Sequence, residues 1–228
     1  MRRQLLDREL QRLQDEILQL GSMVEENLIE AVEVLRRRDM LRSYRLIEAD
    51  KWVNEKRVNI GMEALTVIAT QQPMAGDMRL IAAILEIAGE LERIHDYAKG
   101  IAKINLMIGE DEVPHSLLYV MPQMAENTRR MLRRALDAFS QRDAELARRI
   151  PEADDDVDAL YNLTYRQIIN YVMAKPTAIE HANRLEWVAH NLERSADRVT
   201  NICEWVVYMV TGNYTELDTK VAVTQAAN

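Results

Sequence analysis

Residues 88–101 read AGELERIHDYAKGI and residues 189–202 read AHNLERSADRVTNI, so one stretch of this chain occurs twice. Six of the fourteen positions are identical, and both copies contain Glu-Arg-x-x-Asp. On a helix this spacing places the two carboxylates of each copy on one face, a single turn apart: Glu92 with Asp96, and Glu193 with Asp197. Like charges at this spacing destabilise an isolated helix by about 0.2–0.5 kcal/mol, so the pattern indicates a bound cation, a basic partner or a solvated face.

Long helices are predicted around the first copy. Apolar residues recur every three or four positions from Leu5 to Leu35, which is the periodicity of an amphipathic helix. Two more helices are expected over residues 41–70 and 77–108, with Pro73 breaking the chain between them. Three long helices with short connections indicate an antiparallel three-helix bundle.

The second half of the chain repeats this order. Residues 109–116, GEDEVPHS, have the composition of a linker. Helices are then expected over residues 117–140, 143–174 and 178–211. Pro151 lies inside the middle helix and should kink it or delay its start.

A shift along the chain makes the duplication explicit. Moving by 104 residues aligns Ala49-Asp50 with Ala153-Asp154, and moving by 101 aligns the two Glu-Arg-x-x-Asp motifs. We therefore predict an all-α protein of two tandem antiparallel three-helix bundles related by internal duplication. The predicted domains are the first bundle, the linker, the second bundle and a flexible tail: 1–108, 109–116, 117–214 and 215–228.

Composition and charge exclude several classes of protein. The chain has 29 basic and 37 acidic residues and a net charge of −8, without a basic stripe, so we expect no nucleic-acid partner. Its apolar runs fall far short of the ~20 residues of a membrane span, and the N-terminus lacks the apolar region of a signal peptide, so we expect no membrane insertion. The single cysteine, Cys203, cannot form an intrachain disulfide, which fits a reducing cytoplasm.

A second set of acidic and amide side chains accompanies each repeated motif. Asp50 and Asn54 in the first half match Asp154 and Asp158 in the second. In an antiparallel bundle these pairs could face the Glu-Arg-x-x-Asp pairs on the neighbouring helix, which gives four oxygen-bearing side chains per bundle. Such sites suit hard cations such as Mg, Ca, Mn or iron. The alternative is a set of exposed acids paired with nearby basic residues: Arg93, Lys99, Arg194 and Arg198.

His95 adds a Glu92-x-x-His95 spacing, which is the ligand spacing of ferritin-like di-iron bundles. Such a site needs a second copy, and the matching position of the other half is Ala196. His95 is therefore interpreted as a partly solvated neighbour of the acidic residues or as one extra ligand. Asp77, at the opening of the third helix, is a further possible ligand.

Several longer motifs follow one another along the chain: Ala49-Asp50-Lys51-x-Val53-Asn54, Pro73-x-x-x-Asp77-x-Arg79-Leu80, Leu91-Glu92-Arg93-Ile94-x-Asp96 and Asn201-Ile202-Cys203-Glu204. With the duplicated three-helix unit, they make the chain resemble the PhoU family of bacterial phosphate-transport and phosphate-signalling regulators. The similarity extends over about residues 3–214.

The resemblance implies a regulator rather than an enzyme. PhoU-like proteins are cytoplasmic adaptors, often homodimers, that associate peripherally with membrane complexes through their partners. These partners are the ATPase subunit of the high-affinity phosphate ABC importer and the sensor histidine kinase of the phosphate two-component system. When phosphate is plentiful, the family restrains uptake and keeps the kinase inactive.

The resemblance also implies metal binding, by an iron cluster or by Mn, Mg or Zn, through the acidic pairs: Asp50 and Asn54, Glu92 and Asp96, Asp154 and Asp158, and Glu193 and Asp197. This chain departs from the family pattern at His95, where a glycine is usual, and at Ser195-Ala196. Because Asn54 makes the first site one charge poorer, we expect weaker metal binding there. Two alternative hypotheses about function remain. The chain is a carboxylate-bridged di-metal helical-bundle enzyme or metal store, or it is a structural module whose acids bind Arg/Lys-rich partners.

Overall fold

The computed structural model describes residues 2–109 and 113–217, and every regular element in these ranges is a helix. The all-α prediction is therefore confirmed. The elements, in chain order, are α1 Arg2–Arg37, α2 Met40–Gln71, α3 Ala75–Ile108, α4 His115–Leu118, α5 Met121–Gln141, α6 Ala144–Arg149, η1 Pro151–Ala153, α7 Asp154–Ala174, η2 Pro176–Ala178 and α8 Ile179–Thr211. No helix in the described ranges is both long and apolar enough to cross a membrane.

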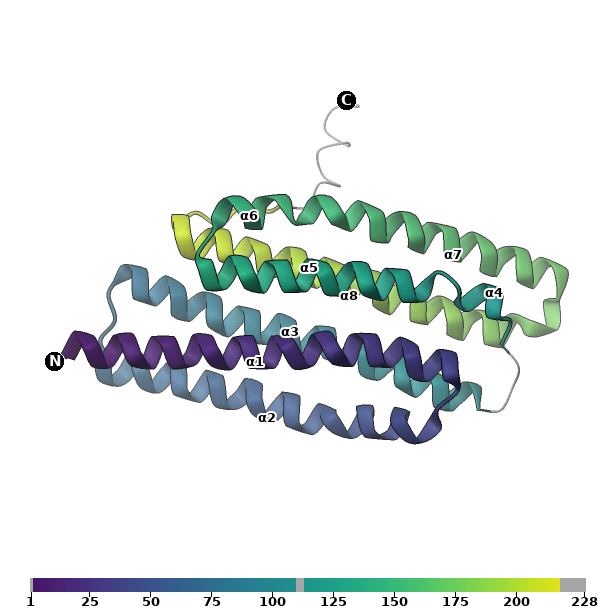
Figure 1. Ribbon diagram of the computed structural model, residues 1–228, viewed down its shortest axis with the longest axis horizontal. Coiled ribbons are helices and arrows are strands. Elements are labelled where there is room, and N and C mark those ends of the chain that lie inside the picture. Colours follow the sequence, from purple (N-terminus) through teal and green to yellow (C-terminus); the bar gives the residue numbers. More distant parts are fainter. Residues whose placement is uncertain (1, 110–112, 218–228) are drawn as a thin grey trace, which may run out of the picture.

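The long helices form two three-helix bundles that lie side by side with their axes nearly parallel (Figure 1). α1, α2 and α3 make the lower bundle, and α5, α7 and α8 make the upper one, with α2 and α7 at the outer edges. α3 packs most extensively against α8, and α1 packs against α5. One hydrophobic core runs through both bundles, so the predicted pair of bundles folds as one packed body.

The apolar stripe of α1 explains why this helix forms. The positions that recur every three or four residues are all buried: Leu6, Leu10, Leu13, Ile17, Leu20, Val24, Leu28, Ala31 and Leu35. Gly21 lies between them without interrupting the helix. A Cβ atom at Gly21 would collide with Cδ1 of Leu136 on α5, so the glycine permits the close approach of the two bundles.

The start of the second helix is built alike in the two repeats. The side chain of Asp39 accepts a hydrogen bond from the backbone N–H of Arg42 at the start of α2, and Asp143 does the same for Leu146 at the start of α6, both at 2.9 Å. Each aspartate satisfies one of the N–H groups that a helix start leaves unpaired. The duplication therefore extends to the caps.

The repeats differ where proline enters. The single helix expected over residues 143–174 is divided into α6, η1 and α7, because Pro151 has no N–H to continue the helical ladder. The helix expected over residues 117–140 is also divided, into α4 and α5. α4 begins at His115, inside the predicted linker, and residues 110–112 of that linker lie outside the described ranges.

The segment that follows α8 is packed at the end of the predicted second bundle and at the start of the predicted tail. The hydroxyl of Tyr214 donates to Glu204 on α8 at 2.7 Å, and its ring lies 5.1 Å from the ring of Trp205. The backbone N–H of Leu217 also donates to Glu204, at 2.9 Å. The chain therefore folds back on α8 as far as residue 217, whereas residues 218–228 of the predicted tail lie outside the described ranges.

Candidate functional site

The first acidic cluster consists of Asp50 and Asn54 on α2 and Glu92 and Asp96 on α3. The side chain of Lys99 contacts two of its members. The Nζ atom of Lys99 lies 2.8 Å from Oδ1 of Asp50 and 2.5 Å from Oδ1 of Asp96. Only 18% of the Lys99 side chain is exposed, so its ammonium group connects α2 and α3 at a largely buried point. The pairing with Lys99, which the sequence offered as part of the alternative to a metal site, is therefore present.

The pKa values of Lys99 and Glu92 are shifted in the first acidic cluster. Burial disfavours the charge on Lys99, but hydrogen bonds from its ammonium group to Asp50 and Asp96 outweigh burial and raise its pKa. Burial also raises the pKa of Glu92, and the nearby charge of Asp96 adds to this rise. Asn54 contributes no charge, and its Nδ2 atom donates to the backbone oxygen of Asp50 at 3.1 Å.

The prediction that His95 is partly solvated is wrong. His95 is completely buried, because it shares the inward face of α3 with Leu91 and Ala98. Its Nδ1 atom lies 3.2 Å from Nδ2 of Asn27 on α1, which donates to it, and burial lowers the pKa of its ring. The hydrogen bond from Asn27 therefore occupies the Nδ1 nitrogen of His95, which could otherwise bind a metal ion.

Asp77 is not part of the first acidic cluster either. It lies nineteen residues before Asp96 on α3, which corresponds to about 28 Å at a rise of 1.5 Å per residue. Both its carboxylate oxygens accept hydrogen bonds from Arg3, at 2.6 and 3.1 Å. Asp77 thus fastens the start of α1 to the start of α3.

The second acidic cluster consists of Asp154 and Asp158 on α7 and Glu193 and Asp197 on α8. α7 packs against α8, as α2 packs against α3. Two basic groups lie near it: Nε of Arg194 lies 4.0 Å from Oδ2 of Asp197, and Nδ1 of His190 lies 3.7 Å from Oε2 of Glu193. The position that matches Lys99 is Thr200.

Thr200 is a buried hydroxyl with an unusual environment. Its exposed fraction is 7%, and its Oγ1 atom has no hydrogen-bond partner among the described residues. Most buried hydroxyl groups in proteins are paired with protein or ordered water. The second acidic cluster therefore has a neutral, unpaired oxygen atom at the helical position that holds an ammonium group in the first.

Arg198 was named above as a possible partner of the motif acids, but its ion pair is with an acid of the other bundle. Its Nη1 atom lies 3.5 Å from Oε2 of Glu90 on α3, and Nδ2 of Asn201 lies 3.2 Å from the same oxygen. These contacts join the two bundles. Sequence periodicity places Glu90 on one face of its helix, but it does not predict which residue of the other bundle pairs with Glu90.

The fit of a metal ion differs between the two clusters. In the described part of the chain, no three His, Cys, Asp or Glu side chains converge to hold a metal ion. The first acidic cluster does not fit a metal, because Lys99 lies between its aspartates. The second acidic cluster has the donor type that hard cations prefer, since all four members carry carboxylates, but these carboxylates do not converge on one point in the structure.

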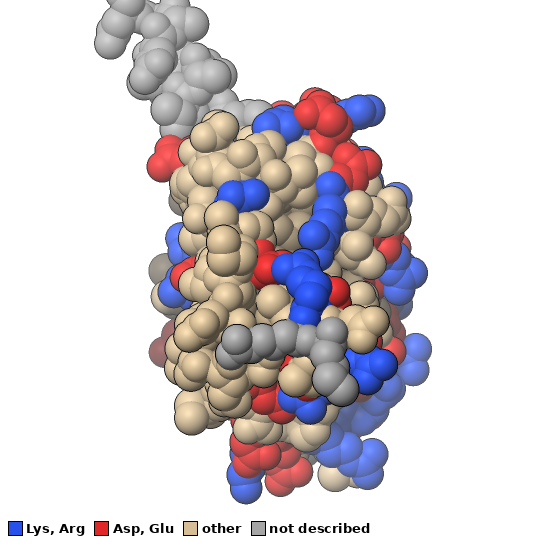
Figure 2. Space-filling model, turned by 90° about the vertical axis from the view of Figure 1, so that its left-hand side faces the viewer, with Lys and Arg blue, Asp and Glu red and all other residues tan. Residues whose placement is uncertain are grey.

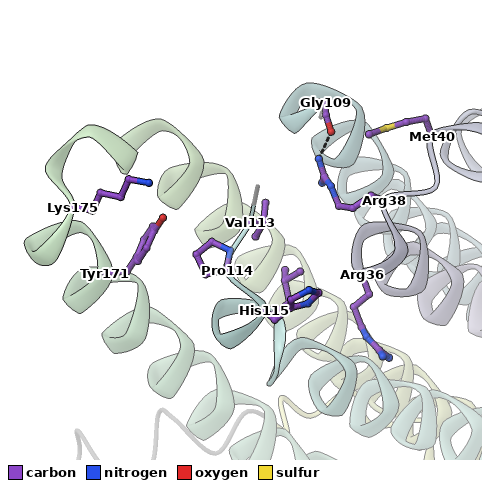
Figure 3. Close-up of a pocket in the computed structure, with 10 residues that line it drawn as sticks. Arg36, Arg38, Met40, Gly109, Val113, Pro114, His115, Tyr171 and Lys175 are labelled. Carbon is purple, nitrogen blue, oxygen red and sulfur yellow. Dashed lines mark hydrogen bonds between the residues drawn. The ribbon is translucent and has the colours of Figure 1, made fainter. Parts of the chain in front are cut away.

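A cavity of about 790 Å³ lies between the ends of the bundles and had no signal in the sequence (Figure 3). Its wall includes four basic side chains from distant segments: Arg36, Arg38, His115 and Lys175. They do not converge, because Arg38 donates to the backbone oxygen of Gly109 and Arg36 points away from Lys175. The cavity therefore lacks the convergent polar groups of a ligand site.

Comparison with known proteins gives one consistent result. Residues 17–104 and residues 121–206 each match the PhoU domain family. The chain is 33% identical to a phosphate-specific transport system accessory protein PhoU homolog of Rhizobium meliloti over 206 residues, which covers 90% of this chain and 87% of the relative. It is 35% identical to the accessory protein PhoU of Escherichia coli over 205 residues, which covers 90% of this chain and 84% of that one.

Solved structures agree with this result. The phosphate transport system regulatory protein PhoU from Streptococcus pneumoniae superposes with a TM-score of 0.84 at 29% identity, covering 92% of this chain and 99% of that one. PhoU from Pseudomonas aeruginosa superposes with a TM-score of 0.82 at 31% identity, covering 91% and 99%.

Proposed function

Since this chain belongs to the PhoU family, we propose that it is an accessory regulatory protein of a phosphate-specific transport system. The observation that carries the proposal is the match of both bundles to the PhoU domain, together with relatives that share nearly the whole length and are named for this role. The protein acts by binding partners and not by catalysis.

The finer proposal concerns what the protein binds. It restrains the phosphate importer through the importer's ATPase subunit, and it holds a sensor histidine kinase inactive when phosphate is plentiful. It works in the cytoplasm, at the membrane only through these partners, and as a homodimer. The proposed partners, location and oligomeric state are those that the resemblance to the PhoU family implies.

One face of the molecule supports a protein partner. Figure 2 looks at the end where α3 begins and α8 ends, and uncharged side chains cover much of the left part of that face. The large apolar side chains exposed near these two helix ends include Met74, Met78, Val210 and Tyr214, and Met74 is 75% exposed. Grouped exposed apolar side chains commonly mark an interaction surface. We propose this face as the contact surface for a protein partner.

The proposal includes a hard divalent or trivalent cation, such as manganese, magnesium or iron, at the second acidic cluster. Asp154 and Asp158 would hold it from α7, and Glu193 and Asp197 from α8. The cation would neutralise carboxylates and fasten the two helices together. A di-metal oxidase is not proposed, because a second Glu-x-x-His spacing is absent from the sequence and Asn27 engages His95.

The regulatory role is tested by removing the gene from its host and growing the cells in phosphate-rich medium. We expect faster phosphate uptake and expression of phosphate-starvation genes, both reversed by a plasmid copy. Purified protein should also retain the ATPase subunit and the kinase in separate binding assays. Unchanged uptake and unchanged starvation-gene expression in the deletion strain would refute the proposed function.

A further inference from the structure

Four aromatic rings form a row across α7 and α8, and we call these four side chains the aromatic row. The ring of Tyr161 on α7 lies 6.5 Å from that of Tyr165 and 6.3 Å from that of His190 on α8. The ring of Trp187 continues the row, 6.0 Å from the ring of His190. The chain has only three Trp, eight Tyr and one Phe, so a quarter of these residues lie at this one place.

The aromatic row is on the surface of the protein. Trp187 is 53% exposed and Tyr165 is 46% exposed, so packing of the core does not account for their rings. Tryptophan and tyrosine are enriched where proteins contact one another, and they supply much of the binding energy there. Small-molecule sites bury most of their ligand, which half-exposed rings cannot do. The aromatic row therefore suits a side chain that a larger partner presents.

The first bundle has no such row. The four matching positions of the first repeat, found with the same shifts of 104 and 101 residues, are not aromatic: Arg57, Gly61, Glu86 and Gly89. A Cβ atom at Gly89 would meet no atom within 4 Å, so packing does not require a glycine there. A three-helix bundle of this family thus forms without aromatic residues at these positions, and the aromatic row is a property of the second bundle alone.

A carboxylate lies beside the aromatic row. Oε1 of Glu186 accepts a hydrogen bond from the hydroxyl of Tyr161 at 2.9 Å, and Glu186 forms no ion pair with the described residues. Arg184 donates to a backbone oxygen of α3 at 2.9 Å, and Nδ1 of His190 lies 3.7 Å from Oε2 of Glu193. Burial, followed by the hydrogen bond to Glu186, raises the pKa of Tyr161 to about 12.

Trp52 on α2 is the contrasting case. It is 43% exposed, and Nζ of Lys56 lies 5.8 Å from the centre of its ring, which is a cation–π distance. Within the described ranges, no Lys or Arg lies over a ring of the aromatic row in this way. Ring faces attract cations because they carry the negative part of the ring quadrupole. The aromatic row and Glu186 therefore offer two attractions to a cation that the described chain does not itself supply.

We propose that the aromatic row and Glu186 form a docking site for an arginine side chain of a protein partner. A guanidinium group stacks on an aromatic ring and donates to a carboxylate at the same time, whereas an ammonium group cannot stack in this way. An anionic lipid surface does not fit, because the carboxylate of Glu186 repels it. The inference rests on the proposed function only in that the protein acts by binding partners, and it names the chemistry of one contact.

This site is separate from the apolar face that is proposed above for a protein partner. Trp187 lies near the start of α8 and Val210 near its end. The 23 residues between these positions correspond to about 35 Å at a rise of 1.5 Å per residue. Two partners can therefore be bound at once, one at each end of α8.

The test uses the full-length chain labelled with ¹⁵N, and its probe is an alanine-based helical peptide with arginine at every fourth position. The indole N–H groups of the three tryptophans give three NMR peaks, so Trp52 and Trp205 are controls within the same molecule. We expect the Trp187 peak to shift saturably with the peptide while the other two peaks stay in place. A peptide with citrulline, the uncharged isostere of arginine, should leave all three peaks unchanged.

Variants extend the test to the proposed partners. Glu186→Gln keeps an acceptor for Tyr161 and removes the charge, so the affinity for the arginine peptide should fall about tenfold. Trp187→Ala should weaken binding of the purified ATPase subunit or of the purified kinase about tenfold, whereas the matched control Trp52→Ala should change neither. If circular dichroism shows that Trp187→Ala does not fold, Tyr165→Ala replaces it.

Five results would overturn the inference. They are a Trp187 peak that does not shift with the arginine peptide, equal shifts of the other tryptophan peaks, an equal effect of the citrulline peptide, undiminished affinity of Glu186→Gln for the arginine peptide, and undiminished binding of both partners by Trp187→Ala. A Trp187 peak that moves with protein concentration alone would assign the aromatic row to a contact between two copies of this chain, which also overturns it.

Failure of the docking site and failure of the proposed function give different results. A chain that represses phosphate uptake but whose Trp187 peak does not respond to the arginine peptide refutes the docking site alone. A chain whose Trp187 peak responds as expected, in a host where deletion leaves uptake and starvation-gene expression unchanged, refutes the regulatory role alone.

Discussion

Replacing Glu90 by alanine should weaken the contact between the two bundles. The Glu90 side chain is 11% exposed, and it accepts hydrogen bonds from Arg198 at 3.5 Å and from Asn201 at 3.2 Å. The Arg198 side chain is itself only 14% exposed, so the substitution leaves a buried guanidinium group without its carboxylate. Removing one partner of a buried pair costs about 3–5 kcal/mol. Because the 3.5 Å contact is long, we expect a loss of about 2–4 kcal/mol in the free energy of unfolding.

Two further variants isolate the origin of this loss. Glu90→Gln keeps an acceptor for Asn201 but lacks the charge, so its loss should be smaller than that of Glu90→Ala. The double variant Glu90→Leu with Arg198→Met replaces both partners by apolar side chains of similar volume. It should recover most of the stability, because neither partner is left unpaired.

The assay is urea unfolding followed by circular dichroism and by fluorescence of the three tryptophans, Trp52 in α2 and Trp187 and Trp205 in α8. Because one hydrophobic core runs through both bundles, the two signals should report one coincident transition in the wild type. If Glu90→Ala lowers the free energy of unfolding by less than about 0.5 kcal/mol, the Glu90–Arg198 contact contributes no more than an exposed ion pair does. A double variant less stable than Glu90→Ala would refute the unpaired-charge argument.

Three other changes have definite expected outcomes. Asp39→Ala and Asp143→Ala each remove a helix cap and should each lower the free energy of unfolding by about 1 kcal/mol in urea titrations. Gly21→Val should lower the melting temperature more than Gly21→Ala, because its larger side chain enters the space of Leu136, and overpacking costs about 1–3 kcal/mol. Burial raises the pKa of Glu25 despite Arg133, so its protonated form favours folding and this contribution is lost as pH rises above about 4.3, the unfolded pKa, through the folded pKa. Relative to the wild type, Glu25→Gln should therefore gain stability between pH 4 and 7.

Each of these expectations has a clear contrary result. Cap variants with wild-type stability would show that water satisfies the helix starts as well as the aspartates do. Equal melting temperatures for the two Gly21 variants would mean that α5 shifts freely away from α1. A constant stability difference across pH for Glu25→Gln would mean that burial does not perturb this carboxyl group.

The fold was predictable to the extent that it depends on local patterns. The stripe along α1, the caps at Asp39 and Asp143, and the break at Pro151 all follow from helical periodicity, hydrogen-bonding capacity or the missing N–H of proline. These are properties of residues a few positions apart. The duplicated motif is therefore enough to predict a duplicated bundle.

The acidic clusters were predictable as sets of candidates but not as contacts. Four basic residues were equally available to pair with the carboxylates, and only the tertiary structure selected Lys99 for the first acidic cluster and directed Arg198 to Glu90 in the other bundle. The same holds for His95, whose burial against Asn27 depends on the rotation of α3 relative to α1.

The physical reason is that periodicity determines which residues share a helix face, whereas the partner of that face depends on how neighbouring helices are rotated and offset. The chain alone showed that Asp77 and Asp96 lie on one helix, but the bond from Arg3 to Asp77 required the start of α1 to be packed beside it. It likewise showed a lysine in one repeat and a threonine in the other. Only the packing of α2 on α3 made that lysine a bridge between helices.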